Sequence, residues 1–429
     1  MKHEKEVEPV EFRIKGCRAL IDGVFVAADM LSRGGSVFPV SPEEPNSPEV
    51  PVFEFHNCLL LPGLIDVHVH LRDPGFSFKE TMHTGTLSAA RGGYTTVCPM
   101  PNLDPVPDSR ETLTLELQRI RDDAVIRVLP YAAITKGEKG QELAELEAMA
   151  PDCFAFSDDG KGVQNADMMR QAMKRASALG KVIVAHCEDE TLLHGGCIHD
   201  GAYAKAHGHR GICSESEWKQ VERDVHLAEE TGCAYHVCHV STKESVAIIR
   251  EAKARGVDVT CETAPHYLLL TEDDLQEDGR FKMNPPIRER ADRDALREGL
   301  LDGTVDMIAT DHAPHTAEEK SRGLEKSLMG VVGLECALSV LYTGLVKTGL
   351  MPMETLIDRM TAAPARRFGL QSGLEAGKPA DFLIFDPDEE WVIDPNDFAS
   401  MGRATPFAGE RVTGRVKMTV CKGEIVWNG

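Results

Sequence analysis

Short apolar runs alternate with stretches of helical periodicity through the middle of this chain, and this alternation restricts its fold more than any other feature. The apolar runs occupy residues 64–69, 94–98, 125–132, 153–157, 182–186, 234–239, 257–262 and 305–310. Helical patterns lie between them, for example at 109–122 and 216–231. Eight strands that alternate with helices predict an α/β fold, a closed (β/α)₈ TIM-type barrel, with an open doubly wound sheet as the alternative. No GxGxxG motif follows the first run, so a dinucleotide site has no support.

Both ends of the chain have the pattern of β structure. Residues 11–28 alternate in polarity and turn at Asp22-Gly23, which is typical of a hairpin. The last fifty residues contain similar runs, at 381–385, 391–393, 416–421 and 424–427. Neither end has enough strands to bury a core alone. We therefore expect one composite small β domain from residues 1–62 and 368–429, beside a barrel of residues 63–367.

Composition excludes several classes of function. The chain has 47 Lys and Arg against 69 Asp and Glu, a net charge of −22, which argues against binding to nucleic acid or to an anionic membrane. The twelve cysteines form no CxxC pair, so a reducing cytoplasm is expected rather than a disulfide framework. Residues 1–8 are charged and predict no signal peptide, and the weakly charged stretch 327–346 predicts a buried helix rather than a membrane span.

Side chains that bind metals follow the strand runs. The first run ends in Asp66-Val67-His68-Val69-His70, and His68 and His70 share one face because residues two apart on a strand point the same way. In the fourth run the large phenylalanines suit the helix-facing side, so Asp159 rather than Asp158 is expected to point inward. The fifth, sixth and eighth runs end at His186, His239 and Asp311.

These residues together predict a metal site at one mouth of the barrel, where barrel enzymes place their active sites. A lone histidine after a strand is usually a core or surface residue, but five strands that deliver a ligand at the same end favour a site. Imidazole and carboxylate suit zinc or a similar divalent ion, and six ligands could serve two ions. The histidines at 194, 199, 207 and 209 are expected in a solvated loop, and His236 is given no role.

Three motifs resemble the amidohydrolase superfamily and, within it, the dihydroorotases of the longer bacterial type (class I). They are Asp66-Val67-His68-Val69-His70-Leu71-Arg72-Asp73-Pro74-Gly75, Met100-Pro101-Asn102 and Thr310-Asp311-His312-Ala313-Pro314-His315. The resemblance runs from about Leu61 to Pro379. It implies a distorted (β/α)₈ barrel with a small β-sandwich built from both termini. It also implies the reversible cyclisation of N-carbamoyl-L-aspartate to L-dihydroorotate and water in pyrimidine (UMP) biosynthesis.

The resemblance also assigns roles to residues. It implies one zinc held by His68, His70, Asp159 and Asp311 and a second held by Asp159, His186 and His239, so one or two Zn²⁺ per chain. Asp159 stands where many relatives have a bridging carboxylated lysine. The substrate would be bound by His70, Arg72, Asn102, Asn284, His315 and the backbone at Met329-Gly330. Asp311 would carry the proton from zinc-bound hydroxide to the leaving ring nitrogen.

Two other readings remain open. One is another cyclic amidase (a hydantoinase, dihydropyrimidinase or allantoinase), although Arg72 favours a substrate with a carboxylate. The other is an inactive homologue that acts as a scaffold for aspartate transcarbamoylase, although all six metal ligands are kept. The resemblance also implies that the chain forms a homo-oligomer, specifically a dimer, and that it associates with aspartate transcarbamoylase. Residues 315–326 are either a lid over the ligand or an ordinary surface loop.

Overall fold

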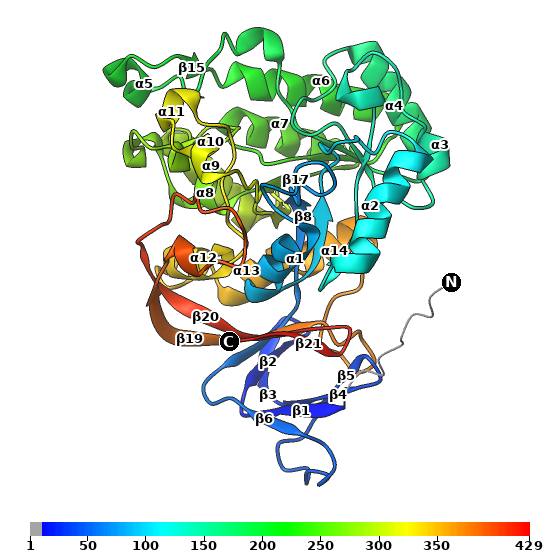
Figure 1. Ribbon diagram of the computed structural model, residues 1–429, viewed down its shortest axis with the longest axis vertical. Coiled ribbons are helices and arrows are strands. Elements are labelled where there is room, and N and C mark those ends of the chain that lie inside the picture. Colours follow the sequence, from blue (N-terminus) through cyan, green and yellow to red (C-terminus); the bar gives the residue numbers. More distant parts are fainter. Residues whose placement is uncertain (1–10) are drawn as a thin grey trace.

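The computed structural model describes residues 11–429. The expectation of no signal peptide concerns residues 1–8 and lies outside the described part. Strands from both ends of the chain form the lower part of the molecule in Figure 1, and the upper part consists of strands surrounded by helices. The site discussed below belongs to the upper part.

The central region contains two parallel sheets whose strands follow chain order. The first has the order β10-β9-β8, with β8 (Leu64–Val69), β9 (Tyr94–Pro99) and β10 (Arg127–Val128). The second joins β11 (Ala132–Ala133), β12 (Phe156–Ser157), β13 (Ile183–Ala185), β16 (Tyr235–Val237), β17 (Val259–Thr263) and β18 (Met307–Ile308). A parallel bridge between Val69 and His312 connects the end of β8 to the chain after β18. The expected α/β arrangement of parallel strands is confirmed.

The main helices alternate with these strands. They are α1 (Met82–Arg91), α2 (Arg110–Asp123), α4 (Ala166–Ala178), α6 (Glu215–Thr231), α7 (Lys243–Ala254), α9 (Arg290–Asp302), α13 (Met353–Met360) and α14 (Ala362–Phe368). Local sequence explains several starts, because Ser109, Asn165 and Thr242 accept hydrogen bonds from the first backbone N–H groups of α2, α4 and α7. The helices predicted at 109–122 and 216–231 agree with α2 and α6 within about two residues.

Shorter helices lie in the connections. They are α3 (Leu146–Met149), α5 (Ala202–His207), α8 (Pro265–Leu269), α10 (Ala317–Lys320), α11 (Gly323–Lys326) and α12 (Ala337–Leu341), the last continued by a π-helical turn, Tyr342–Val346. No helix of the described residues is long and apolar enough to cross a membrane. All twelve cysteines are free, and only Cys213 is not fully buried.

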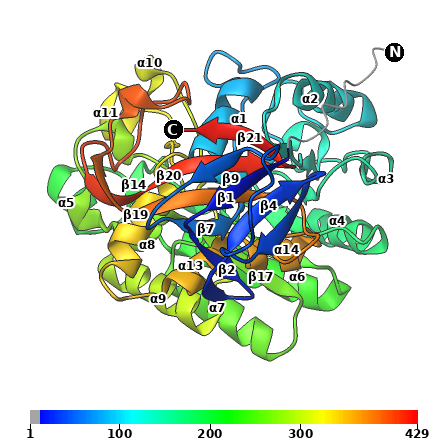
Figure 2. The same ribbon diagram turned by 90° about the horizontal axis from the view of Figure 1, so that it is seen from below.

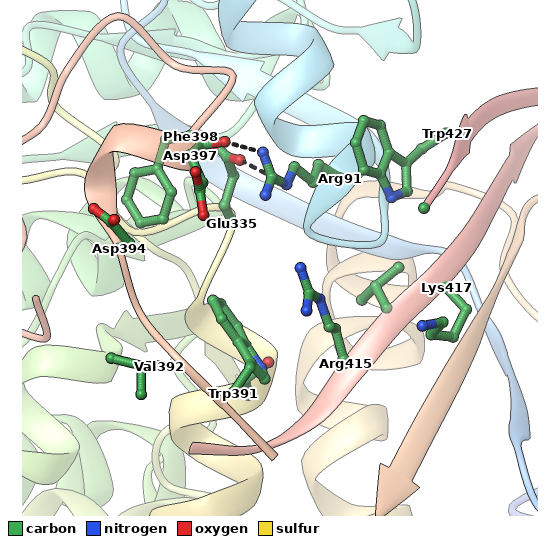
Figure 3. A pocket seen from close by; sticks show the side chains of 13 residues that line it. Arg91, Glu335, Trp391, Val392, Asp394, Asp397, Phe398, Arg415, Lys417 and Trp427 are labelled. Atoms are coloured by element: carbon green, nitrogen blue, oxygen red, sulfur yellow. Dashed lines mark hydrogen bonds and ion pairs between the residues drawn. The ribbon is translucent and has the colours of Figure 1, made fainter. Parts of the chain in front are cut away.

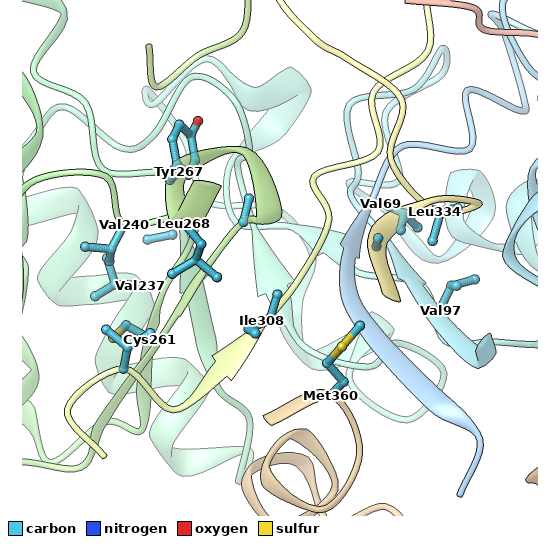
Figure 4. Close-up of a cluster of buried hydrophobic side chains, with 14 of the residues drawn as sticks. Val69, Val97, Val237, Val240, Cys261, Tyr267, Leu268, Ile308, Leu334 and Met360 are labelled. Carbon is cyan, nitrogen blue, oxygen red and sulfur yellow. The ribbon is translucent and has the colours of Figure 1, made fainter. Parts of the chain in front are cut away.

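Apolar side chains fill the space between strands and helices. Val97, Val237 and Ile308 from the strands lie in the same buried cluster as Leu268 and Met360 from helices α8 and α13 (Figure 4). Each exposes at most 1 % of its surface. Burial of one such side chain contributes about 1.5–3 kcal/mol. The strand ends that carry the site therefore rest on a close-packed base.

Two mixed sheets make up the lower part (Figure 2). The first has the order β5-β4-β1-β6, from β1 (Phe12–Lys15), β4 (Asp29–Arg33), β5 (Ser36–Val40) and β6 (Val52–Glu54). The second has the order β21-β20-β19-β7-β2-β3, from β2 (Arg18–Ile21), β3 (Val24–Ala27), β7 (Leu59–Pro62), β19 (Phe382–Val392), β20 (Arg411–Cys421) and β21 (Glu424–Asn428). One buried cluster contains Phe12 and Met30 of the first sheet with Leu60, Phe382 and Met418 of the second. Strands from both ends of the chain thus share one core.

The sequence explains most of these strands. The predicted turn at Asp22-Gly23 joins β2 to β3, and its two residues have φ of 49° and 74°, the left-handed values that a two-residue hairpin turn requires. The runs predicted at 381–385 and 391–393 are parts of one long strand, β19, which continues through register shifts against β20. The charged residues between the two runs concealed this continuity.

A cavity of about 280 Å³ lies where the two parts meet, between α1, β19, β20 and β21 (Figure 3). The Arg91 guanidinium lies 5.3 Å from the Trp427 ring, and its Nε is 3.2 Å from Glu335 Oε2. The Arg415 guanidinium lies 5.2 Å from the ring of Trp391. The arginines that line this cavity therefore already contact indole rings or a carboxylate of the protein. The cavity belongs to the junction between the two parts and not to the site described next.

Candidate active site

The six predicted metal ligands converge at the carboxyl ends of the parallel strands. Each lies in or within three residues of the end of a strand, on β8, β12, β13, β16 or β18. All six are buried, with at most 6 % of the surface of each exposed. They are His68, His70, Asp159, His186, His239 and Asp311. Five distant segments of the chain therefore deliver ligand atoms to one buried place.

Asp159 lies at the centre of this cluster. Its Oδ1 is 3.5 Å from His68 Nε2, 3.7 Å from His186 Nδ1 and 3.5 Å from His239 Nε2. Its Oδ2 is 3.6 Å from His70 Nε2. A carboxylate with both oxygens among four imidazoles can bridge two ions. Asp158, by contrast, accepts hydrogen bonds from the backbone of Ile134 and Thr135, which agrees with the inward orientation predicted for Asp159.

Asp311 completes the cluster on the side of β8. Its Oδ1 lies 3.1 Å from His70 Nε2 and 3.5 Å from His68 Nε2. Among the six predicted ligands, two sets of ligand atoms lie within 4.8 Å of one another: His68 with His70 and Asp311, and His68 with Asp159 and His239. His186 belongs to neither set, although its Nδ1 is 2.8 Å from His239 Nε2. The first predicted ligand set is therefore compact, and the second is more open.

Outer partners fix which nitrogen of each imidazole faces inward. His68 Nδ1 lies 2.7 Å from Glu262 Oε1, and His70 Nδ1 lies 3.0 Å from Asn102 Oδ1. Both partners are acceptors, so each Nδ1 carries the proton and each Nε2 presents its lone pair to the cluster. Glu188 Oε2 lies 3.5 Å from His186 Nε2, which directs the Nδ1 of that ring inward. Metal-binding histidines are commonly held in this way.

Two buried atoms at the centre have no hydrogen-bond partner among residues 11–429. They are His68 Nε2 and Asp159 Oδ1. Buried polar atoms are rarely left unpaired, because an unpaired atom loses its hydration without compensation. The unpaired atoms, the inward lone pairs and the nitrogen and oxygen donor set together fit a divalent cation.

Mutual interactions keep the carboxylates of the cluster ionised. Burial raises the pKa of Asp311, but the hydrogen bond with His70 and the proximity of His68 outweigh it and hold this pKa below its usual range. Burial also raises the pKa of Asp159, but His68 and His239 outweigh this effect, so the pKa of Asp159 lies well below its usual range. Both groups are therefore proton acceptors at neutral pH.

Three of the non-glycine residues predicted for the site have a left-handed backbone. The φ angles are 63° at Arg72, 33° at His239 and 49° at Asp311. Side chains other than glycine rarely adopt this region, at a cost of about 1–3 kcal/mol each, and such residues gather at functional sites. The surrounding packing thus holds these side chains in directions that a relaxed chain would not choose.

A cavity of about 280 Å³ opens beside the cluster. All the residues predicted to bind substrate line it: His70, Arg72, Asn102, Asn284, His315, Met329 and Gly330. Glu138 and Lys161, which sequence reasoning did not assign to the site, also line it. Its size suits a small polar molecule.

Arg72 and Asn284 have unused hydrogen-bonding groups in this cavity. Arg72 is 9 % exposed, and the one hydrogen bond that its side chain makes within residues 11–429 runs from Nε to Pro314 O at 3.3 Å. Arg72 is therefore not part of a surface salt bridge. Asn284 Nδ2 donates to Glu188 Oε1 at 2.9 Å, while its buried Oδ1 has no partner among the described residues. The cavity thus offers a guanidinium fork and an amide acceptor to a ligand.

Known proteins resemble this chain over most of its length. Two family models match it, described as "Dihydro-orotase-like" over residues 57–245 and "Amidohydrolase family" over residues 225–427. The chain is 52% identical to the dihydroorotase of Bacillus caldolyticus over 409 residues, which cover 95% of this chain and 96% of the relative. It is 56% identical to that of Geobacillus thermodenitrificans over 379 residues, 88% and 89% of the two chains. The chain belongs to the dihydroorotase family.

Solved structures share the fold of this dihydroorotase family member. The L-hydantoinase (dihydropyrimidinase) of Arthrobacter aurescens superposes with a TM-score of 0.86 and 26% identity, covering 98% of this chain and 96% of that one. The dihydropyrimidinase of Brevibacillus agri gives 0.85 and 22% identity, covering 98% and 95%. At such identity the second likeness concerns the fold alone.

Sequence reasoning missed Glu262 and gave His236 no role. Glu262 is 1 % exposed. Its Oε1 lies 2.7 Å from His68 Nδ1, and its Oε2 lies 3.1 Å from His236 Nε2. The signal was present, because the seventh apolar run ends at Glu262 just as other runs end at ligands. The expectation that His236 has no role is therefore wrong: it supports the carboxylate that orients a site histidine.

The expectation of a solvated loop is wrong for His199. This residue lies in β14 (Ile198–His199), which pairs with β15 (Gly211–Ile212), and it is 6 % exposed. Its Nδ1 lies 3.2 Å from Arg288 Nη1. Burial, together with the charge of Arg288, lowers the pKa of His199 to about 3, so its ring is neutral.

Proposed function

We propose that this chain is a dihydroorotase, which interconverts N-carbamoyl-L-aspartate with L-dihydroorotate and water in pyrimidine biosynthesis. One observation carries the proposal: Arg72, buried and with free guanidinium donors, lines the same small cavity as the histidine and aspartate cluster. Such an arginine suits a ligand that bears a carboxylate beside its reacting carbonyl. The relatives named above carry the same activity in their names.

The metal proposed for the cluster is zinc, one or two ions per chain, held by His68, His70, Asp159 and Asp311 and by Asp159, His186 and His239. Nitrogen and carboxylate donors suit this ion. When bound, it polarises the substrate carbonyl and lowers the pKa of water.

The chain's own residues do the remaining work. Asp311, ionised and beside the cluster, accepts a proton from the attacking water and delivers it to the ring nitrogen as the amide bond breaks. The Arg72 fork holds the substrate carboxylate, and the free Oδ1 of Asn284 accepts a substrate N–H. Asn102, His315 and the backbone at Met329-Gly330 close the cavity around the ligand. Ring closure reverses each step and consumes one proton, so acid favours the cyclic form.

We further infer that the two parallel sheets are one closed barrel of residues 63–367. The third apolar run supplies both β10 and β11 and so links the sheets on one side, and the Val69–His312 bridge supports closure on the other. Residues 1–62 and 368–429 are proposed as a composite β-sandwich domain. The buried cluster shared by its two sheets supports that division.

The deciding experiment compares turnover of dihydroorotate and dihydrouracil while metal content per chain is measured. Turnover of dihydroorotate by protein that contains zinc is expected. Turnover of dihydrouracil alone would reassign the chain to the hydantoinase and dihydropyrimidinase type. Folded protein that contains zinc and turns over neither would favour the scaffold reading.

Three proposals concern context. We propose that the chain forms a homo-oligomer, specifically a dimer, and sedimentation of the purified chain tests this. Association with aspartate transcarbamoylase is tested by sedimentation of the two proteins mixed. A cytoplasmic location is proposed because free, mostly buried thiols suit a reducing compartment.

A further inference from the structure

A buried lysine holds the loop of residues 328–330, which borders the substrate cavity. Lys320 is 6 % exposed. Its Nζ donates to Leu328 O at 2.7 Å, to Gly330 O at 2.7 Å and to Lys282 O at 2.9 Å. An ammonium group has three N–H donors and no acceptor, so three carbonyl oxygens use its full capacity. One side chain thus fixes two carbonyls of the loop.

His315 holds the carbonyl between them. Its Nε2 donates to Met329 O at 2.8 Å, and its Nδ1 lies 3.2 Å from Lys79 Nζ. The ammonium of Lys79 can only donate, so Nδ1 is the acceptor and Nε2 carries the proton. All three carbonyls of the loop therefore point to donors of the protein, and none is left to face a ligand.

The loop backbone is also fixed by close packing. Gly330 has a φ of 133°, and a Cβ at this position would lie 2.7 Å from Ala313 O and 3.1 Å from His315 Nε2. The loop therefore lies directly against the segment that follows Asp311. Gly330 N donates to Lys282 O at 3.1 Å, whereas the N–H of Met329 makes no hydrogen bond within residues 11–429.

We propose that Lys320 is a positioning residue for substrate binding, because it turns the carbonyls of Leu328 and Gly330 away from the cavity and leaves the Met329 N–H free to donate to the substrate. This inference rests on the proposed function, since the loop belongs to the cavity assigned to dihydroorotate. Lys320 itself does not line that cavity, so it acts through the loop and not by contact with substrate.

The test compares Lys320→Met with a matched control, Lys326→Met. Lys326 lies in α11 of the same segment and is exposed. K320M is expected to raise KM for dihydroorotate by about tenfold or more while kcat stays within about threefold, because uniform substrate binding is lost. Zinc content should be unchanged, and K326M should match the wild type. A wild-type KM in K320M, or a loss of kcat alone, would overturn the proposal.

A second variant and a second measurement cover failure of K320M to fold. Lys320→Gln keeps two N–H donors, and we expect it to raise KM by about threefold or more. Amide hydrogen exchange at residues 328–330, measured without substrate, should be faster than in the wild type, while exchange in α6 should not change. Equal exchange and equal KM would overturn the role of Lys320. Absence of dihydroorotate turnover in the wild type would instead refute the proposed function and leave the exchange result independent.

Discussion

Replacement of Glu262 by glutamine tests whether this carboxylate orients the metal site. Glu262 is buried between His68 Nδ1 and His236 Nε2. Burial alone would raise its pKa, but His68 and His236 lower it to about 2, so it is ionised. Glutamine has the same shape and keeps an oxygen for the N–H of His68, so E262Q removes the charge and places an amide NH2 group where the second oxygen faces His236 Nε2.

The magnitude follows from what the charge does. A lost outer partner of a metal-binding histidine costs about 10–100-fold in metal affinity, or about 1.4–2.7 kcal/mol. The pKa of Glu262, lowered from 4.5 to about 2 although burial opposes this, shows that the charge interacts favourably with the two histidines. E262Q should therefore bind zinc about 10–100-fold more weakly, because His68 becomes a poorer ligand.

The assay is a zinc titration against a competing chelator, with turnover followed as free zinc is restored. Glu272→Gln is the matched control, because Glu272 is also buried, at 7 % exposure, but accepts from the backbone N–H groups of Ala202 and Tyr203. E272Q should keep wild-type zinc affinity. Wild-type affinity in E262Q would refute the view that Glu262 prepares His68 to bind metal.

Three further predictions concern catalysis, binding and pH. Asp311→Ala should lower kcat by about 10²–10⁴-fold, as expected for a positioned acid–base group, and near-normal turnover would remove Asp311 from the mechanism. Arg72→Met should raise KM for dihydroorotate about ten- to hundredfold through loss of charged hydrogen bonds, and an unchanged KM would contradict its role. At His199, burial and Arg288 lower the pKa from 6.5 to about 3, so the unfolded chain binds a proton that the folded chain refuses. The contribution of neutral His199 to the free energy of unfolding is complete above pH 6.5 and falls by about 1.4 kcal/mol per pH unit as the pH drops toward 3. His199→Gln should remove this part of the pH dependence. An equal change in the free energy of unfolding between pH 6 and pH 5 in H199Q and in the wild type, measured by denaturant titration, would count against it.

Periodicity was enough to predict the parts of the fold that position the site. β8 and β9 lie where the apolar runs predicted strands, and α2 begins at the residue after the cap that its sequence provides. The parity of the fourth strand separated Asp159 from Asp158, because that choice depends only on alternation along one strand. These features are local, and a sequence displays them directly.

The missed features depend on contacts between distant segments. His68 and Glu262 are 194 residues apart, and His199 and Arg288 are 89 residues apart. A polar neighbourhood in the sequence around His199 says nothing of the buried arginine that meets it in the fold. A polar group can be buried at little cost only where the fold brings a hydrogen-bond partner to it, so its burial depends on residues far away in the sequence.

The site therefore has two kinds of residues, and they differ in how far the sequence can predict them. Ligands on strand ends occupy places that the strand periodicity sets, so their positions follow from the alternating pattern. Glu262 and Lys320 fix instead which atom of a ligand or loop faces inward, and both do so from other segments of the chain. If this division is right, their substitutions separate cleanly: loss of Glu262 changes metal affinity, and loss of Lys320 changes KM at constant metal content. Identical effects of the two substitutions would mean that the cluster and the loop act as one unit.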